Sequence, residues 1–167
     1  MNSKSKKIYN HIAPGLSKLE WRMAQHIKPG GNWQDIPKAI PSKRLEQIRE
    51  SGGRTTYYGR LLSDKPAYTI TTYFNRLGNS SNLHPNQQRM ISIREGARLQ
   101  SFRDDYIFYG PKTSQYKQIG NAVPPLLARV IAEIGKDVTH NTPAILGVCE
   151  VENKDVLNEK YILVQKG

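Results

Sequence analysis

The sequence is 167 residues long, with 37% hydrophobic residues and a formal net charge of +11. This length fits one domain with appendages, and the low apolar content favours a core that a partner completes. No run approaches the roughly 18 apolar residues of a membrane helix, the N-terminus lacks the apolar region of a secretory signal, and the single cysteine excludes a disulfide framework and a Cys-based zinc site.

The positive charge is distributed unevenly. Residues 1–60 contain 12 Lys and Arg residues against 4 Asp and Glu residues, whereas residues 137–167 contain 3 against 5. Such an asymmetry suggests a polyanionic partner, usually a nucleic acid, but a solvated basic face has the same composition. The charge alone leaves both interpretations open.

The N-terminal third is predicted to be helical after a loose start. Residues 1–15 read as a flexible basic arm that ends in a Pro-Gly turn signal. Apolar residues recur at helical spacing over Leu16–Ile27, and Pro29 stops that helix. Ser42 is predicted to cap a second helix, which Gly52 ends.

The middle of the chain has strand composition. Arg54–Phe74 is rich in Thr, Tyr and Ile and is punctuated by Ser63–Pro66, which predicts a two-stranded antiparallel hairpin. Asn75–Asn86 is a polar loop with too few apolar residues to pack. Loops of this length inside compact domains are often functional.

A helix follows this loop. Ser92 and Glu95 fit a capping box, in which the serine side chain accepts from the N3 amide and the glutamate accepts from the N-cap amide. We therefore expect a helix over residues 93–101. Further on, residues 114–119 are predicted to form a helical turn.

A last helix and a tail complete the predicted elements. Pro124 is well placed to start a helix with a broad apolar face, and Gly135 is predicted to end it. Residues 137–167 form a C-terminal tail with two short β-like runs.

The sequence shows no complete active site. Cys149 lies in an apolar run beside Glu150, a setting that disfavours a thiolate, so we expect a core or edge-strand residue rather than a nucleophile. The 4 histidines lack metal-ligand spacing, and no glycine-rich phosphate loop is present. Between Arg54 and His84, however, Arg, Asn and Thr are interleaved with Tyr. These side chains can read base edges, although an ordinary polar loop has a similar composition.

Two segments resemble shared motifs of DNA cytosine-5 methyltransferases. Residues 91–102 (ISIREGARLQSF) are similar to the ninth motif of that family, and residues 116–125 (YKQIGNAVPP) are similar to the tenth, in the right order and spacing. Upstream, GGRTTYYGRL and KPAYTITTYFNR resemble the target-recognition domain that precedes the ninth motif. The resemblance covers about residues 16–136.

The resemblance implies an α+β fold. A small target-recognition domain with the β-hairpin region would span residues 16–113 and include the ninth motif. A tenth-motif helix would span residues 114–136 and pack on a catalytic domain that this sequence lacks. Residues 137–167 match no part of the family pattern.

The resemblance also implies a function, namely site-specific DNA methylation of the restriction–modification type. The family binds double-stranded DNA, uses S-adenosylmethionine, flips the cytosine out, attacks C6 with a cysteine and transfers methyl to C5. Its Phe-x-Gly-x-Gly, Pro-Cys and Glu-Asn-Val motifs have no counterpart in this sequence.

We therefore expect the recognition subunit of a split enzyme, inactive alone and active in a hetero-dimer with a catalytic chain in the prokaryotic cytoplasm. Met1 followed by a basic arm fits a separate subunit, as it fits an engineered fragment. The alternative is a stand-alone or degenerate DNA-binding module without methyltransferase activity.

Residue roles are carried over by position from the family pattern. No catalytic or metal-binding residue is expected. Arg103 replaces the usual Pro, so the turn before Asp104 is expected to be looser. The cofactor is expected near Asn121, Ala122 and Val123, and the recognition domain is expected to be organised by Ser92, Arg94, Glu95 and Arg98. The residues expected to bind DNA are Arg54, Tyr57, Tyr58, Arg60, Thr69, Thr71, Thr72, Asn75, Arg76 and His84.

Overall fold

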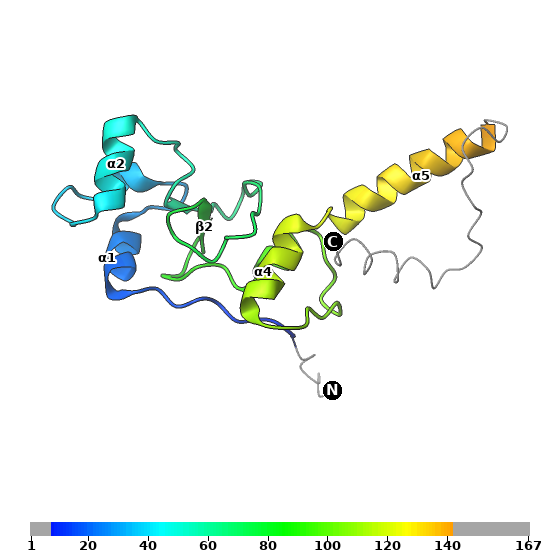
Figure 1. The fold of residues 1–167 in the computed structure, drawn as a ribbon, viewed down its shortest axis with the longest axis horizontal. Coiled ribbons are helices and arrows are strands. Elements are labelled where there is room, and N and C mark those ends of the chain that lie inside the picture. Colours follow the sequence, from blue (N-terminus) through cyan, green and yellow to red (C-terminus); the bar gives the residue numbers. More distant parts are fainter. Residues whose placement is uncertain (1–7, 142–167) are drawn as a thin grey trace. The chain divides into compact units, whose positions relative to one another are not determined.

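The computed structural model describes the backbone of residues 8–141 and the side chains of residues 8–136 (Figure 1). This part of the chain is an α+β arrangement, which divides after Pro124 into two units. No helix within it has the length and apolar character needed to cross a membrane. Its elements are α1 (Lys18–His26), η1 (Trp33–Asp35), α2 (Lys43–Ser51), β1 (Gly59–Arg60), β2 (Ser81–Leu83), α3 (Ile93–Leu99), α4 (Lys112–Asn121) and α5 (Pro125–Asn141).

Serine caps begin the first three α-helices. Ser17, Ser42 and Ser92 each accept a hydrogen bond from the backbone amide three residues further on. In α1 and α3 a glutamate at N3 completes the capping box, so the box predicted at Ser92 is confirmed. Gly52 ends α2 with φ 65°, as predicted, because glycine adopts the left-handed conformation without steric cost.

The C-terminal helices are longer than predicted. The turn expected over residues 114–119 is part of α4, which also includes Gly120 and Asn121. Gly135 does not end α5, which continues to Asn141. A helical glycine costs only about 1 kcal/mol relative to alanine, so one such residue need not stop a helix. The remainder of the predicted tail, including Cys149, lies outside the described residues.

The predicted antiparallel hairpin within Arg54–Phe74 is wrong. β1 pairs in parallel with β2, which lies inside the segment expected to be a polar loop. Gly59 permits this pairing, because a Cβ atom there would lie 1.9 Å from the Oγ and 2.7 Å from the Cα of Ser81. Glycine in a strand often marks such a close backbone approach.

Two hydrophobic clusters hold the first unit together. The first cluster packs α1 and α2 against Leu77, Leu83 and Met90. The second cluster packs segment 61–74 against α3 and α4. At its centre the rings of Phe74 and Tyr116 meet edge to face, with centroids 4.7 Å apart. Gly96 makes room for this contact, because a Cβ atom there would lie 2.7 Å from Cζ of Phe74.

Residues 8–12, predicted to be part of a loose arm, are fastened to α3. The amides of Ile93 and Arg94 donate to the carbonyls of Ile12 and Asn10, at 3.2 and 3.0 Å. The Asn10 side chain donates to the Phe108 carbonyl (2.9 Å) and accepts from the Phe108 amide (3.0 Å). We call residues 8–12 the N-terminal strap, because they belong to the folded unit.

Candidate functional site

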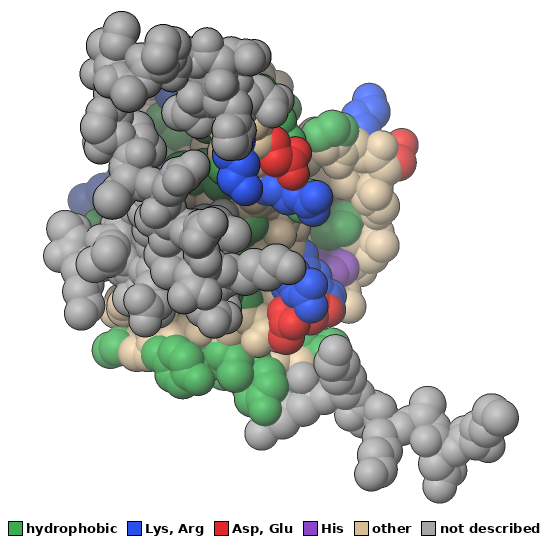
Figure 2. Space-filling model, turned by 90° about the vertical axis from the view of Figure 1, so that its right-hand side faces the viewer, with side chains coloured by type: hydrophobic (Ala, Val, Ile, Leu, Met, Phe, Trp, Pro, Cys, Tyr) green, Lys and Arg blue, Asp and Glu red, His purple; other side chains and the backbone are tan. Residues whose placement is uncertain are grey.

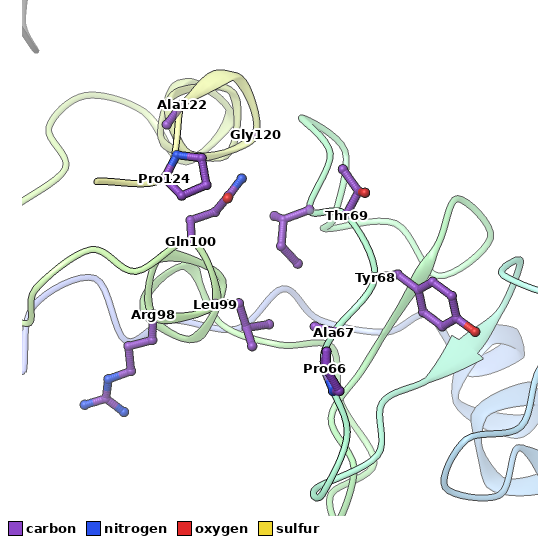
Figure 3. A pocket seen from close by; sticks show the side chains of 11 residues that line it. Pro66, Ala67, Tyr68, Thr69, Arg98, Leu99, Gln100, Gly120, Ala122 and Pro124 are labelled. Atoms are coloured by element: carbon purple, nitrogen blue, oxygen red, sulfur yellow. The ribbon is translucent and has the colours of Figure 1, made fainter. Parts of the chain in front are cut away.

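Three stretches of the first unit line a cavity of about 670 Å³ (Figure 3). One wall is Pro66–Ile70, which follows β1. The opposite wall comes from the end of α4 and the residues after it, Gly120, Ala122 and Pro124. Arg98, Leu99 and Gln100, from the end of α3, complete the lining. The cavity therefore brings together the segment similar to a recognition domain and the segments similar to the ninth and tenth motifs.

Short backbone contacts set the distance between these walls. The Gln100 side chain donates to the Ile119 carbonyl at 3.2 Å and so ties the end of α3 to α4. Gly120 lies against the backbone of Thr72, which follows the wall Pro66–Ile70. A Cβ atom at Gly120 would lie 2.3 Å from the Thr72 nitrogen. Figure 3 shows Leu99 directed toward Pro66 and Ala67, whereas the Arg98 guanidinium points away from the cavity.

Arg94, a buried residue of α3, joins the N-terminal strap to the loop after α3. Its side chain is fully buried, and its guanidinium donates to the carbonyls of Tyr9 (2.9 Å), Arg103 (2.8 Å) and Tyr106. The first of these lies in the N-terminal strap and the others in the loop after α3. The turn at Arg103, expected to be loose, is therefore held by a buried cation.

Glu95 is held by a second arginine at the start of α3. Its carboxylate accepts two hydrogen bonds from Arg89 and one from the Ser92 amide, each 2.7 Å long. Burial disfavours the charged form and raises the pKa of Glu95, but these hydrogen bonds outweigh burial and lower the pKa from 4.5 to about 2. The carboxylate is therefore ionised wherever the chain is folded above about pH 3.

We expect Glu95 to make folding sensitive to acid. Because its pKa is lower in the folded state, its contribution is complete above pH 4.5 and is lost as the pH falls toward 2. The shift corresponds to about 3 kcal/mol, which partial solvent exposure reduces to about 2 kcal/mol. Urea unfolding at pH 7 and pH 3 should show a smaller pH dependence for Glu95→Gln than for the unchanged chain. Glu133→Gln, in an exposed pair with Arg129, serves as the control, and equal acid sensitivity of all three proteins would contradict the assignment.

The residues expected to bind DNA differ in accessibility. Arg54, Thr69, Thr71 and Arg76 are exposed, and Tyr57, Thr72, Asn75 and His84 are half-buried. Tyr58 is only 5% exposed and belongs to the first cluster, so its ring does not reach a ligand in this conformation. Only Thr69 of this set lines the cavity.

Arg60, which the sequence analysis expects to bind DNA, lies in the interior of the first unit. Its side chain is 4% exposed. The guanidinium donates to the carbonyls of Ala24 and Ile27 at the end of α1, to those of His84 and Gln87, and to the side chain of Gln88, all within 2.6–2.8 Å. Burial lowers the pKa of Arg60, and the negative end of the α1 dipole stabilises its charge. Arg60 therefore holds the loop at His84 against the end of α1.

Basic side chains near α3 are largely neutralised. Figure 2 shows one face on which Lys and Arg side chains lie beside Asp and Glu side chains. Ion pairs join Arg89 to Glu95, Arg98 to Asp104 and Arg103 to Asp105 at 2.7–2.8 Å. Among the described side chains, Arg54 and Arg76 form no ion pair within 4.0 Å. Their charges are therefore available to an external anion.

Of the three residues expected near a cofactor, only Ala122 lines the cavity. Ala122 is extended, with ψ 142°, and lines the cavity. Asn121 and Val123, on either side of it, are exposed and do not line it. Leu99, Gln100 and Gly120 were not singled out from the sequence as site residues. Of these, Gly120 carries a sequence signal, because glycine inside a helical pattern costs about 1 kcal/mol relative to alanine.

Comparison with known proteins assigns the family. The family model of C-5 cytosine-specific DNA methylases matches residues 2–136. The chain belongs to this family. The Type II methylase M.HgiDII of Herpetosiphon aurantiacus is 43% identical over 128 residues, which cover 74% of this chain and 36% of that protein. The Type II methyltransferase M1.HphI of Haemophilus parahaemolyticus is 40% identical over 126 residues, which cover 75% of this chain and 30% of that protein.

This methylase chain is therefore similar to only part of each relative. The putative Type II methyltransferase M.OihORF3336P of Oceanobacillus iheyensis is 52% identical over a shorter stretch of 77 residues, 16% of its length. The chain spans about a third of the length of M.HgiDII and less of the others named here. The described cavity lies within the residues that the family model matches.

Proposed function

We propose that this chain is the DNA-recognition part of a site-specific DNA (cytosine-5) methyltransferase that uses S-adenosylmethionine. The shared cavity carries the proposal. Thr69, expected to face DNA, and Ala122, expected to face the cofactor, line the same hollow, and Leu99 from α3 lies in its lining too. Methyl transfer requires the target base and the methyl donor to be held together, which a joint between these two segments would favour.

Double-stranded DNA is the proposed substrate of the exposed segments after α2. Arg54 and Arg76 supply positive charges without acidic partners in the described part, and Thr69 and Thr71, which lie between them in the sequence, are exposed. Arginines of this kind contact phosphates and base edges. Arg94, Glu95 and Arg98 would act indirectly, by holding the strap and loops around α3.

The cofactor contact of this chain would be partial. S-adenosylmethionine, when bound, supplies the methyl group. Half-buried Ala122 and Pro124 present an apolar surface, and Gln100 adds one amide group. The cavity lining contains no carboxylate to hold ribose hydroxyls, so these residues fit one wall of a cofactor site and not a whole one.

A catalytic chain would supply the rest of the site, and α5 would dock on it. The α5 side chains of Leu127, Val130, Ile131 and Ile134 follow helical spacing and are each 51–59% exposed. Exposed apolar faces of this kind usually mark an interface. We therefore propose a hetero-dimer that acts on DNA in the bacterial cytoplasm, with a stand-alone DNA-binding module as the alternative.

A chimaera with M.HgiDII tests the recognition role. Residues 8–124 of this chain would replace the corresponding part of that relative, which keeps its own catalytic part and its own counterpart of α5. We expect the chimaera to methylate the sites that the isolated chain selects from random duplexes, because the grafted unit would select the site. Bisulfite sequencing of a plasmid library reads out every modified cytosine.

The isolated chain provides the control. It should bind duplex DNA with an affinity that falls as salt rises, and it should transfer no methyl group by itself. A folded, active chimaera whose methylated sites do not match the duplex sequences that the isolated chain selects would exclude the recognition role. Binding of DNA together with a folded chimaera that methylates nothing would instead favour the stand-alone module.

A further inference from the structure

An exposed aromatic–arginine pair projects from the segment between β1 and β2. The Cζ atom of Arg76 lies 4.9 Å from the centre of the Tyr73 ring. Both side chains are exposed, with Tyr73 at 47%. Because both side chains are exposed, the pair contributes little to the hydrophobic core. We therefore consider a role in binding.

The backbone beneath this pair is rigidly mounted. Phe74 and Leu77, which alternate with the pair in the sequence, are 0% and 1% exposed and enter the second and first clusters, respectively. Turns link the Phe74 amide to Thr71, the Arg76 amide to Tyr73 and the Asn79 amide to Arg76, at 3.1–3.3 Å. Phe74 and Leu77, each buried in a different cluster, hold the loop, and residues 73 and 76 are exposed.

The neighbouring loop is fixed from α2 as well. The Arg44 guanidinium donates to the carbonyl of Gly78 and to the side chain of Asn79, both at 3.1 Å. The segment from Tyr73 to Asn79 thus has little freedom to rearrange when a ligand arrives. Preorganised side chains lose less entropy on binding and discriminate more sharply between ligands.

The guanidinium of Arg76 lies over the Tyr73 ring and has no acidic partner among the described residues. A guanidinium that lies over a ring keeps its in-plane N–H donors available. A phosphate contact needs only a positive charge, whereas bidentate recognition of guanine O6 and N7 needs a guanidinium plane of fixed orientation. The ring of Tyr73 supplies that orientation.

We propose that Arg76, oriented by Tyr73, reads a guanine in the major groove of the target DNA and thereby helps to set the site that is methylated. This inference rests on the proposed function. Arg76 is then a specificity-determining residue, and Tyr73 is a positioning residue that acts through it. Arg54, which is exposed and has no aromatic partner among the described residues, would contact the DNA backbone.

Selection from a randomised duplex library tests the proposal. The complete chain would be incubated with duplexes that contain a random central region, and the bound fraction sequenced. For Arg76→Lys, which keeps the charge, we expect the preference for guanine at one position to fall about 10-fold or more, the range for loss of a bidentate base contact. Binding to unselected DNA should change little. Arg54→Lys should leave the sequence preference unaltered.

Variants of Tyr73 separate positioning from folding. Tyr73→Phe keeps the ring and should retain the preference, whereas Tyr73→Ala should weaken it at the same position as Arg76→Lys. Thermal unfolding verifies that each variant is folded, as the exposure of both side chains leads us to expect. An unchanged preference in Arg76→Lys, or a uniform loss of affinity across all sequences, would overturn the role of Arg76 and leave the proposed function standing. A chain that binds no duplex DNA would refute the proposed function itself.

Discussion

Replacing Arg94 with methionine should lower the free energy of unfolding by about 3–5 kcal/mol. Methionine can occupy the space of the aliphatic stem, but it donates no hydrogen bond. The carbonyls of Tyr9, Arg103 and Tyr106 would then lose their shared donor. Each buried acceptor without a partner costs about 1–3 kcal/mol, less where water can reach it. The loss of one side chain would release both the N-terminal strap and the loop after α3.

Urea unfolding of the two proteins at pH 7 measures this effect. Arg129→Met is the matched control, because Arg129 is exposed and makes one ion pair on the surface of α5, with Glu133. We expect Arg129→Met to change the free energy of unfolding by less than about 1 kcal/mol, as for other surface ion pairs. The loss of stability in Arg94→Lys should lie between those of Arg94→Met and Arg129→Met, because an ammonium keeps the charge but cannot reach all three carbonyls. Equal effects of Arg94→Met and Arg129→Met would show that the buried network is not needed for stability.

The helices were predicted from the sequence because their signals are local. The caps at Ser42 and Ser92 and the stop at Gly52 each depend on residues within one turn, and the structure has all of them. Where a boundary depends on more than local propensity, the prediction failed. Gly135 looked like a helix end, yet α5 continues past it, because a single glycine weakens a helix without breaking it.

Strand pairing was predicted wrongly because it is non-local. The composition of Arg54–Phe74 resembles a hairpin, but periodicity within a segment does not say which segment it pairs with. β1 finds its partner about twenty residues along the chain, where Gly59 allows the backbone of Ser81 to approach. The N-terminal strap escaped prediction for the same reason, since Asn10 binds Phe108 across the whole unit.

The arginines show how much of a binding site is hidden from sequence reading. Arg54, Arg60 and Arg76 lie within one polar stretch and look equivalent there. In the structure, the Arg60 guanidinium donates to buried backbone carbonyls. Arg76 lies over the ring of Tyr73 and forms no ion pair among the described residues. Burial of a charged side chain depends on acceptors that the fold assembles from distant loops, so composition cannot reveal it.

Gly120→Ala should destabilise the chain by about 3 kcal/mol, although alanine is the better helix former. The added Cβ atom would lie 2.3 Å from the nitrogen and 2.5 Å from the Cα of Thr72, and 2.5 Å from the carbonyl carbon of Thr71. These are backbone atoms, which cannot swing aside as the end of a side chain could. The gain of about 1 kcal/mol from helix propensity is therefore smaller than the cost of separating α4 from the segment before Phe74.

The matched control for this prediction is Gly135→Ala, in which alanine enters a helix with no heavy atom within 4 Å of the new Cβ. That change should leave the unfolding midpoint unaltered or raise it, whereas Gly120→Ala should lower the midpoint. Because Gly120 also sets the distance between α4 and Thr72, Gly120→Ala in the M.HgiDII chimaera should reduce methyl transfer more than it reduces DNA binding. If Gly120→Ala and Gly135→Ala both stabilised the chain, α4 and segment 71–72 would move apart at little cost. The cavity beside them would then not have a fixed width.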